Sequence, residues 1–176
     1  NMVAWQLGLK WGDALGVPNL FLRTEYNLAR PYIYSHREVL TNWSHYQQPL
    51  AHPWGANFRE LLVQGNYRYQ RWSLFAAYHY GEIGRNAEGE NWGGDIFESW
   101  DTRTLTTGVF AVQGQTGKLS YLAAELAYTL NPNYNLEVHA GYRARTETTP
   151  KALARPDSRW FYFGLRTNVY TSYQDF

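Results

Sequence analysis

The sequence predicts an all-β protein, an antiparallel transmembrane β-barrel of which the chain supplies about seven C-terminal strands. Apolar and polar residues alternate with period 2 in seven segments of about nine to eleven residues, the length with which a tilted strand crosses a bilayer. The connections between these segments are short and long in turn. Aromatic residues are 18% of the chain, with 15 Tyr, 8 Trp and 8 Phe, more than a soluble domain of this size usually carries.

Each segment sets an apolar series against a polar or small one. The first opposes Trp and Leu to Gln, Gly and Lys; the second opposes Leu and Tyr to Arg and Glu; the third opposes Leu, Val and Tyr to Gln, Asn and Arg. The remaining four repeat this contrast with Leu, Ala, Val, Tyr and Phe on the apolar side. We expect strands at 3–12, 20–28, 61–69, 72–81, 121–130, 136–145 and 160–169.

The connections predict the orientation. Short ones cover 13–19, 70–71 and 131–135, and long ones cover 31–58, 82–117 and 146–159. Outer-membrane barrels have short periplasmic turns and long extracellular loops. Because bacterial single-chain barrels have an even number of strands, we expect further strands before Asn1 and treat residues 1–176 as the C-terminal part of a single barrel domain.

Aromatic residues at the strand ends fit the interfacial girdles of such a barrel, where the ring and its polar tip both find partners. They are Trp5, Trp11, Tyr26, Tyr69, Trp72, Tyr80, Tyr128 and Tyr142. The chain ends in an aromatic segment with Tyr173 and Phe176, which resembles the membrane-insertion signal of outer-membrane barrels. The parity of Phe176 predicts a bulge or an unpaired tail near Tyr173.

Several motifs carry a family resemblance. They are Tyr34-Ser35-His36, the run SHYQQPLAHPWGANFRE at 44–60, GQTGK at 114–118, LNPNYNL at 130–136 and YQDF at 173–176. Over about residues 20–176 the chain resembles Bacteroidota outer-membrane proteins of gliding motility, which are similar to Wzi-like capsule-assembly barrels. The resemblance implies a barrel of roughly twice this length or more with a cell-surface role, and it supplies no catalytic residues.

The two longest loops hold the candidate binding residues. They are His36, His45, His52 and Trp54 in the first loop, and Trp92 and Trp100 in the second. The histidine spacings of nine and seven residues match no compact metal motif, so we expect loop hydrogen bonds and neither metal nor cofactor. The second loop also carries many carboxylates. These carboxylates leave open a solvated surface loop, a Ca²⁺ site or stacking of the neighbouring tryptophans on sugar rings.

Charged residues on the polar side of the strands carry both signs. They are Arg23, Glu25, Arg68, Glu125, Glu137, Arg143, Arg145 and Arg166. We expect an ion-pair network across the barrel lumen, because a selective pore would carry a ring of one sign. The alternative is a basic patch of Arg143, Arg145 and Arg166 for an anionic sugar or phosphate.

Composition narrows the function. A net charge of +1 argues against a nucleic-acid partner, and the absence of cysteine excludes disulfides and thiol catalysis. We expect a non-enzymatic protein of the cell outer membrane whose partners are lipid, surface polysaccharide or other outer-membrane and secretion proteins. The alternatives are a porin for small solutes and, less favoured, a hydrolase in which Asp95, Asp101 and His45 meet.

Overall fold

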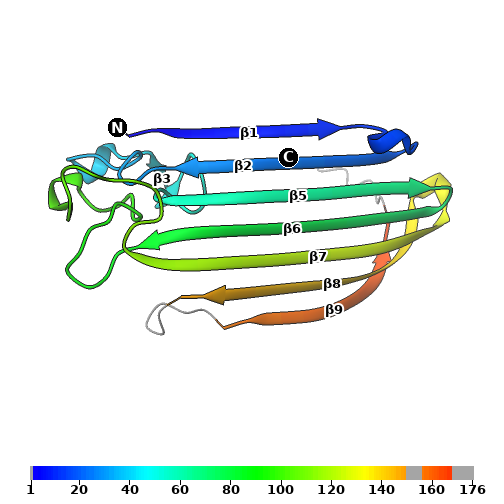
Figure 1. Cartoon of the computed structure of the whole chain (residues 1–176). Coiled ribbons are helices and arrows are strands. Elements are labelled where there is room, and N and C mark those ends of the chain that lie inside the picture. Colours follow the sequence, from blue (N-terminus) through cyan, green and yellow to red (C-terminus); the bar gives the residue numbers. More distant parts are fainter. Residues whose placement is uncertain (1, 150–155, 168–176) are drawn as a thin grey trace, which may run out of the picture.

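Seven long strands form one antiparallel sheet in which neighbours in the chain are neighbours in space (Figure 1). The computed structural model describes residues 2–149 and 156–167. The strands, in sheet order, are β1 (Ala4–Trp11), β2 (Leu20–Ala29), β5 (Phe58–Tyr69), β6 (Trp72–Arg85), β7 (Gln115–Asn131), β8 (Leu136–Thr148) and β9 (Ser158–Arg166). The predicted all-β class and the seven antiparallel strands are confirmed.

The remaining elements are short. A two-stranded hairpin of β3 (Ser44–His45) and β4 (Gln48–Pro49) lies within the first long loop. Four 3₁₀ turns are η1 (Ala14–Gly16), η2 (Val39–Thr41), η3 (Trp100–Thr102) and η4 (Pro132–Tyr134). Among the described residues, no helix has the length and hydropathy needed to cross a membrane.

The middle strands extend further toward the long loops than the sequence predicts. β5 begins at Phe58 rather than at 61, β6 continues to Arg85, and β7 begins at Gln115 rather than at 121. At these ends outward positions such as Arg59 and Glu82 are charged, so the hydrophobic alternation stops before the backbone ladder does. The prediction was based on alternation alone and therefore truncated the strands.

The connections are sorted by length between the two ends of the sheet (Figure 1). The turns at one end join β1 to β2, β5 to β6 and β7 to β8. The long loops between β2 and β5 and between β6 and β7 lie at the other end, which we call the loop end. The predicted alternation of short and long connections is therefore present.

One face of the sheet is apolar from edge to edge. The strand registers place β1 Leu7 in one row with Tyr26, Leu61 and Tyr80, and the other rows continue the pattern. We call this surface the apolar face; its exposed members include Leu7, Leu9, Leu61, Val63, Leu74, Leu122, Leu126, Val138, Phe161, Phe163 and Leu165. Leu7 is 69% exposed and Phe163 is 88% exposed. The opposite surface, the polar face, carries the charged residues.

Aromatic residues border the apolar face, and from β1 onward both borders are displaced toward the turn end in uneven steps; Tyr69, Trp72 and Tyr128 share one row. At the turn end, Trp11 of β1 shares its row with Ala124 of β7, whereas the aromatic of β7 is Tyr128, four residues further on after four strand pairings. A slip of one residue per pairing is a rise of about 3.4 Å against a strand spacing of about 4.8 Å. The borders are therefore inclined by about 35° to the row direction.

The loop-end border is displaced in the same direction, toward the turn end. Trp5 of β1 shares its row with Thr148 of β8, whereas the aromatic of β8 is Tyr142, six residues from Thr148 after five pairings. The two borders thus give average inclinations of about 35° and about 40°. The predicted terminal signal of Tyr173 and Phe176, and the predicted bulge near Tyr173, lie outside the described residues. A bulge that the sequence analysis did not predict shifts the register between Thr129 and Asn131.

Candidate functional site

The two long loops pack on each other at the loop end and form one body, which we call the loop cap (residues 30–57 and 86–114). Backbone hydrogen bonds join the loops directly, from Tyr32 N to Gly93 O at 3.1 Å and from Trp100 N to His36 O at 3.4 Å. Arg30 also donates to the Val109 carbonyl of the second loop. The first loop is thus held by the second.

Asn57 is the centre of the loop cap. Its side chain is fully buried, and its amide nitrogen donates to the carbonyls of Gly84, Trp92 and Gln113 at 3.0, 3.2 and 2.8 Å. Its amide oxygen accepts from the backbone N–H groups of Val112 at 2.7 Å and Gln113 at 3.1 Å. One side chain therefore joins the end of β6 to both ends of the second loop.

Asn91 forms a second buried node. Its amide donates to the Ser99 carbonyl and to the Thr102 hydroxyl, both at 2.9 Å, and its oxygen accepts from Gly93 N. The Tyr32 hydroxyl, from the first loop, donates to the Asn91 carbonyl at 2.5 Å. Burial raises the pKa of Tyr32, which keeps the phenol a donor.

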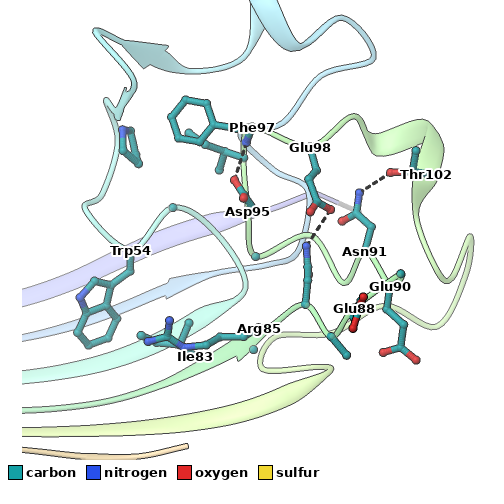
Figure 2. Close-up of a pocket in the computed structure, with 18 of the residues that line it drawn as sticks. Trp54, Ile83, Arg85, Glu88, Glu90, Asn91, Asp95, Phe97, Glu98 and Thr102 are labelled. Carbon is teal, nitrogen blue, oxygen red and sulfur yellow. Dashed lines mark hydrogen bonds between the residues drawn. The ribbon is translucent and has the colours of Figure 1, made fainter. Parts of the chain in front are cut away.

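A groove of about 770 Å³ lies between the loop cap and the loop end of β6. Trp54 and Phe97 supply aromatic surface, and Arg85, Asn86 and Asn91 supply polar groups. Figure 2 shows Trp54 at one side of the groove, with Asp95, Glu98 and Asn91 across it. Its remaining carboxylates are Glu88 and Glu90.

The Trp54 ring packs over Gly81. A Cβ at Gly81 would lie closer than 3.0 Å to the Trp54 ring, so a larger residue at this position of β6 would displace the indole. The ring also packs edge-on against His52 and Phe58, with centroids 5.6 Å away in each case. The groove therefore has one fixed aromatic wall.

The acidic groups make the groove electronegative. Burial and the neighbouring Asp95 carboxylate raise the pKa of Glu98, and a hydrogen bond from Asn86 at 2.9 Å partly offsets this. The Asp95 carboxylate itself accepts from Phe97 N at 2.8 Å. Because Glu98 resists ionisation, the groove disfavours a further negative charge.

This raised pKa predicts a pH-dependent stability. The folded cap holds the Glu98 proton more tightly than the unfolded chain does. The contribution of Glu98 to the free energy of unfolding is therefore greatest below its ordinary pKa of about 4.3, and it falls as pH rises through the raised value. Glu98→Gln is expected to remove this fall. Thermal unfolding between about pH 4 and pH 7 measures it; identical pH dependence in both proteins would contradict it.

The three loop histidines have different neighbours. His36 stacks on Trp100 with centroids 5.2 Å apart, and His45 packs edge-on against Tyr46 at 4.3 Å. His52 stacks on Phe58 at 4.3 Å and lies 3.0 Å from the Glu60 carboxylate. Within residues 2–149 and 156–167, no three His, Asp or Glu side chains gather as metal ligands.

The remaining candidate tryptophans belong to the second loop. Trp92 donates from its indole nitrogen to Glu90 at 2.7 Å, and Trp100 begins η3. Of the six candidate binding residues, only Trp54 lines the groove. The other five lie outside the groove.

Most of the predicted charges on the polar face are paired. Arg23 bonds Glu25 at 2.6 Å, and Arg166 bonds Glu125 at 3.1 Å and Glu137 at 2.9 Å. Three of the predicted residues are placed differently. Arg145 pairs with Glu147, Arg143 lies 5.1 Å above the Tyr162 ring, and Arg68 has no ion pair with any described residue.

The three residues of the hydrolase alternative are held apart by their own partners. Asp101 forms an ion pair with Arg37 at 3.0 Å, the Asp95 carboxylate accepts a hydrogen bond from Phe97 N, and the His45 ring contacts Tyr46. In the part of the chain that the structure describes, no hydrogen bond or ion pair links any two of them.

The residues that build the cap were missed in the sequence analysis. Asn57 lies in the segment 44–60, and Asn91 lies beside Trp92. A single asparagine in a loop belongs to no periodic pattern, so the sequence gives no sign that its side chain is buried. Asn27 of β2, which donates to Glu60 at 3.1 Å, was not singled out either.

Comparison with protein-family models, with curated proteins and with solved structures finds no match to the chain.

Proposed function

We propose that the chain is part of a β-barrel in a bacterial outer membrane, with a non-enzymatic binding or structural role at the cell surface. The observation that carries the proposal is the apolar face, which spans all seven strands and stays exposed. A soluble protein rarely exposes an apolar patch of more than a few hundred Å². In contact with the hydrocarbon core of a bilayer, such a face carries no free-energy penalty for exposure to solvent.

The borders of this face support the proposal. From Trp72 to Tyr80 the apolar span of β6 covers eight residue steps, about 27 Å along the strand. At an inclination of about 35° this spans about 22 Å of bilayer, close to the apolar band of about 25 Å in outer-membrane barrels. The border inclinations of about 35° and about 40° lie within the strand tilt of such barrels, about 35–45°. Length and tilt therefore agree.

The edges of the sheet require partners in this setting. Within the described residues, β1 and β9 are each paired on one side only. Unpaired backbone groups in hydrocarbon cost several kcal/mol each. We propose that further strands close the sheet at these two edges.

The loop cap then faces the cell exterior, where its groove would take surface polysaccharide. Trp54 offers a ring for stacking on a sugar, and the half-buried Asn86 offers its amide for a hydroxyl group. Roles in gliding motility, capsule assembly or secretion are each compatible with such a site. The paired charges of the polar face favour a stiffened interior, so we place this role ahead of a porin; steady single-channel conductance of the native protein would reverse that order.

Membrane insertion is tested by single cysteines, because the chain has none of its own. Cysteine at Leu74, on the apolar face, and at Leu40, which is 98% exposed in the loop cap, are labelled with a polarity-sensitive dye. In liposomes we expect a blue-shifted emission at position 74 and a water-like emission at position 40. A water-like emission at both positions in the folded protein would end the proposal.

The groove predicts a preference among sugars. Four carboxylates line it, so neutral dextran and cationic chitosan oligomers are expected to bind better than anionic alginate oligomers. Trp54→Ala is expected to weaken binding about tenfold by removing the stacking surface. Calorimetry measures both effects. Trp43→Ala is the control, since Trp43 is exposed in the cap and lies outside the groove; equal losses in the two variants would refute the assignment.

A further inference from the structure

We propose that Arg59 and Lys118 bind the phosphate group of an anionic lipid headgroup at the loop-end border of the apolar face. The inference rests on the proposed membrane location and adds a specific ligand to it. Arg59, Glu82 and Lys118 lie in one row across β5, β6 and β7. Their side chains belong to the outward, apolar face, immediately beyond its last apolar row.

The two cations converge on one carboxylate. Arg59 donates from Nε to Glu82 at 2.6 Å, and Lys118 Nζ lies 3.9 Å from the other carboxylate oxygen. The Tyr80 hydroxyl also donates to Glu82, at 3.0 Å. Glu82 is therefore well satisfied, and it holds the two cationic ends on either side of itself.

The cations are more accessible than the carboxylate. The side chains of Arg59 and Lys118 are 54% and 56% exposed, whereas that of Glu82 is 12% exposed. The site carries two positive charges and one negative charge. Its accessible surface is positive, with guanidinium and ammonium donors left free to bind phosphate oxygens.

The position of the row of Arg59 and Lys118 along the strands indicates a lipid headgroup as the ligand. The next row toward the turn end contains Leu61, Tyr80 and Ser120, and the following one contains Val63, Tyr78 and Leu122. Hydrocarbon covering these rows would place the lipid headgroups level with Arg59 and Lys118. Basic side chains at the end of a membrane segment reach the interface in this way.

The same border continues along its slope. Arg159 of β9 faces the apolar side, opposite Ala144, two rows closer to the turn end than Lys118. Relative to Arg59 this is four residues after four pairings, the average slope of the aromatic borders, whereas Lys118 shares the row of Arg59. A third outward cation thus lies near the loop-end border.

The test uses the full-length protein in detergent and native mass spectrometry. The probes are lipid A, a diphosphorylated glucosamine lipid, and zwitterionic phosphatidylcholine, with inorganic phosphate as competitor. Wild type is expected to retain lipid A over phosphatidylcholine, and Arg59→Gln/Lys118→Gln is expected to lose about tenfold or more of that retention. Arg68→Gln, on the polar face, is the matched control and should retain lipid A like wild type.

The outcomes are distinguishable. Equal lipid A retention by the double variant and wild type would overturn the proposal, and so would complete displacement by inorganic phosphate, which would indicate a site for the free ion. Dye-labelled Leu74→Cys reports insertion separately. Insertion without a lipid A preference would overturn this inference alone, whereas failure to insert would overturn the proposed function as well.

Discussion

Asn57→Ala is expected to release the loop cap from the sheet while the strands stay paired. The substitution leaves three carbonyls and two backbone N–H groups without their buried partner. Each unsatisfied buried group costs about 1–3 kcal/mol, so we expect local opening to become easier by at least about 3 kcal/mol. Hydrogen exchange should show protection in residues 84–93 and 110–114 reduced by about hundredfold or more.

The control for this variant is Asn66→Ala. Asn66 lies on the polar face of β5, away from the loop cap, and its side chain bonds no described residue. It should leave exchange in the loop cap within a few-fold of wild type. Protection that survives Asn57→Ala unchanged would show that loop packing alone holds the cap.

Val63→Arg is expected to damage the protein more than the same charge one residue away. Val63 is exposed on the apolar face, and Gln64 occupies the polar face beside it. An arginine facing lipid near the bilayer midplane costs about 2–4 kcal/mol, whereas one facing a wet interior costs little. Urea unfolding from liposomes should therefore separate Val63→Arg from Gln64→Arg by at least about 2 kcal/mol.

Several results would count against this prediction. Equal unfolding free energies for the two variants would mean that the two faces see the same solvent. A larger loss for Gln64→Arg would reverse the assignment of the faces. Gln64→Arg also controls for the bulk and charge of arginine on β5.

The strands were predictable because their signal is local and periodic. Trp5, Leu7 and Leu9 identify β1 without any knowledge of its neighbours, since a strand with two unlike environments must alternate. The extra length of β6 up to Arg85 was not predictable in this way. There the backbone ladder continues although the apolar-face positions are Glu82 and Gly84, so pairing with β7, rather than the side-chain pattern, determines the end.

The loop cap shows the limit of sequence reasoning more clearly. The aromatic and histidine residues drew attention because their chemistry is conspicuous, and His36 and Trp100 do contact each other across the two loops. Asn57 forms more of the hydrogen bonds that hold the loop cap, but its residue type does not indicate this role. Its role depends on carbonyls and N–H groups that belong to Gly84, Trp92 and Gln113, far away in sequence.

The slope of the aromatic borders sets a condition on any closed form of this sheet. From Trp11 on β1 to Tyr128 on β7 the border is displaced by four residues in four pairings, an average of about one residue per pairing. A cylinder built with that stagger returns to its first strand out of step by about as many residues as it has strands, which is the shear number of the barrel. The strands that join β1 to β9 must therefore carry the same stagger, and this fixes where their own tyrosines and tryptophans belong.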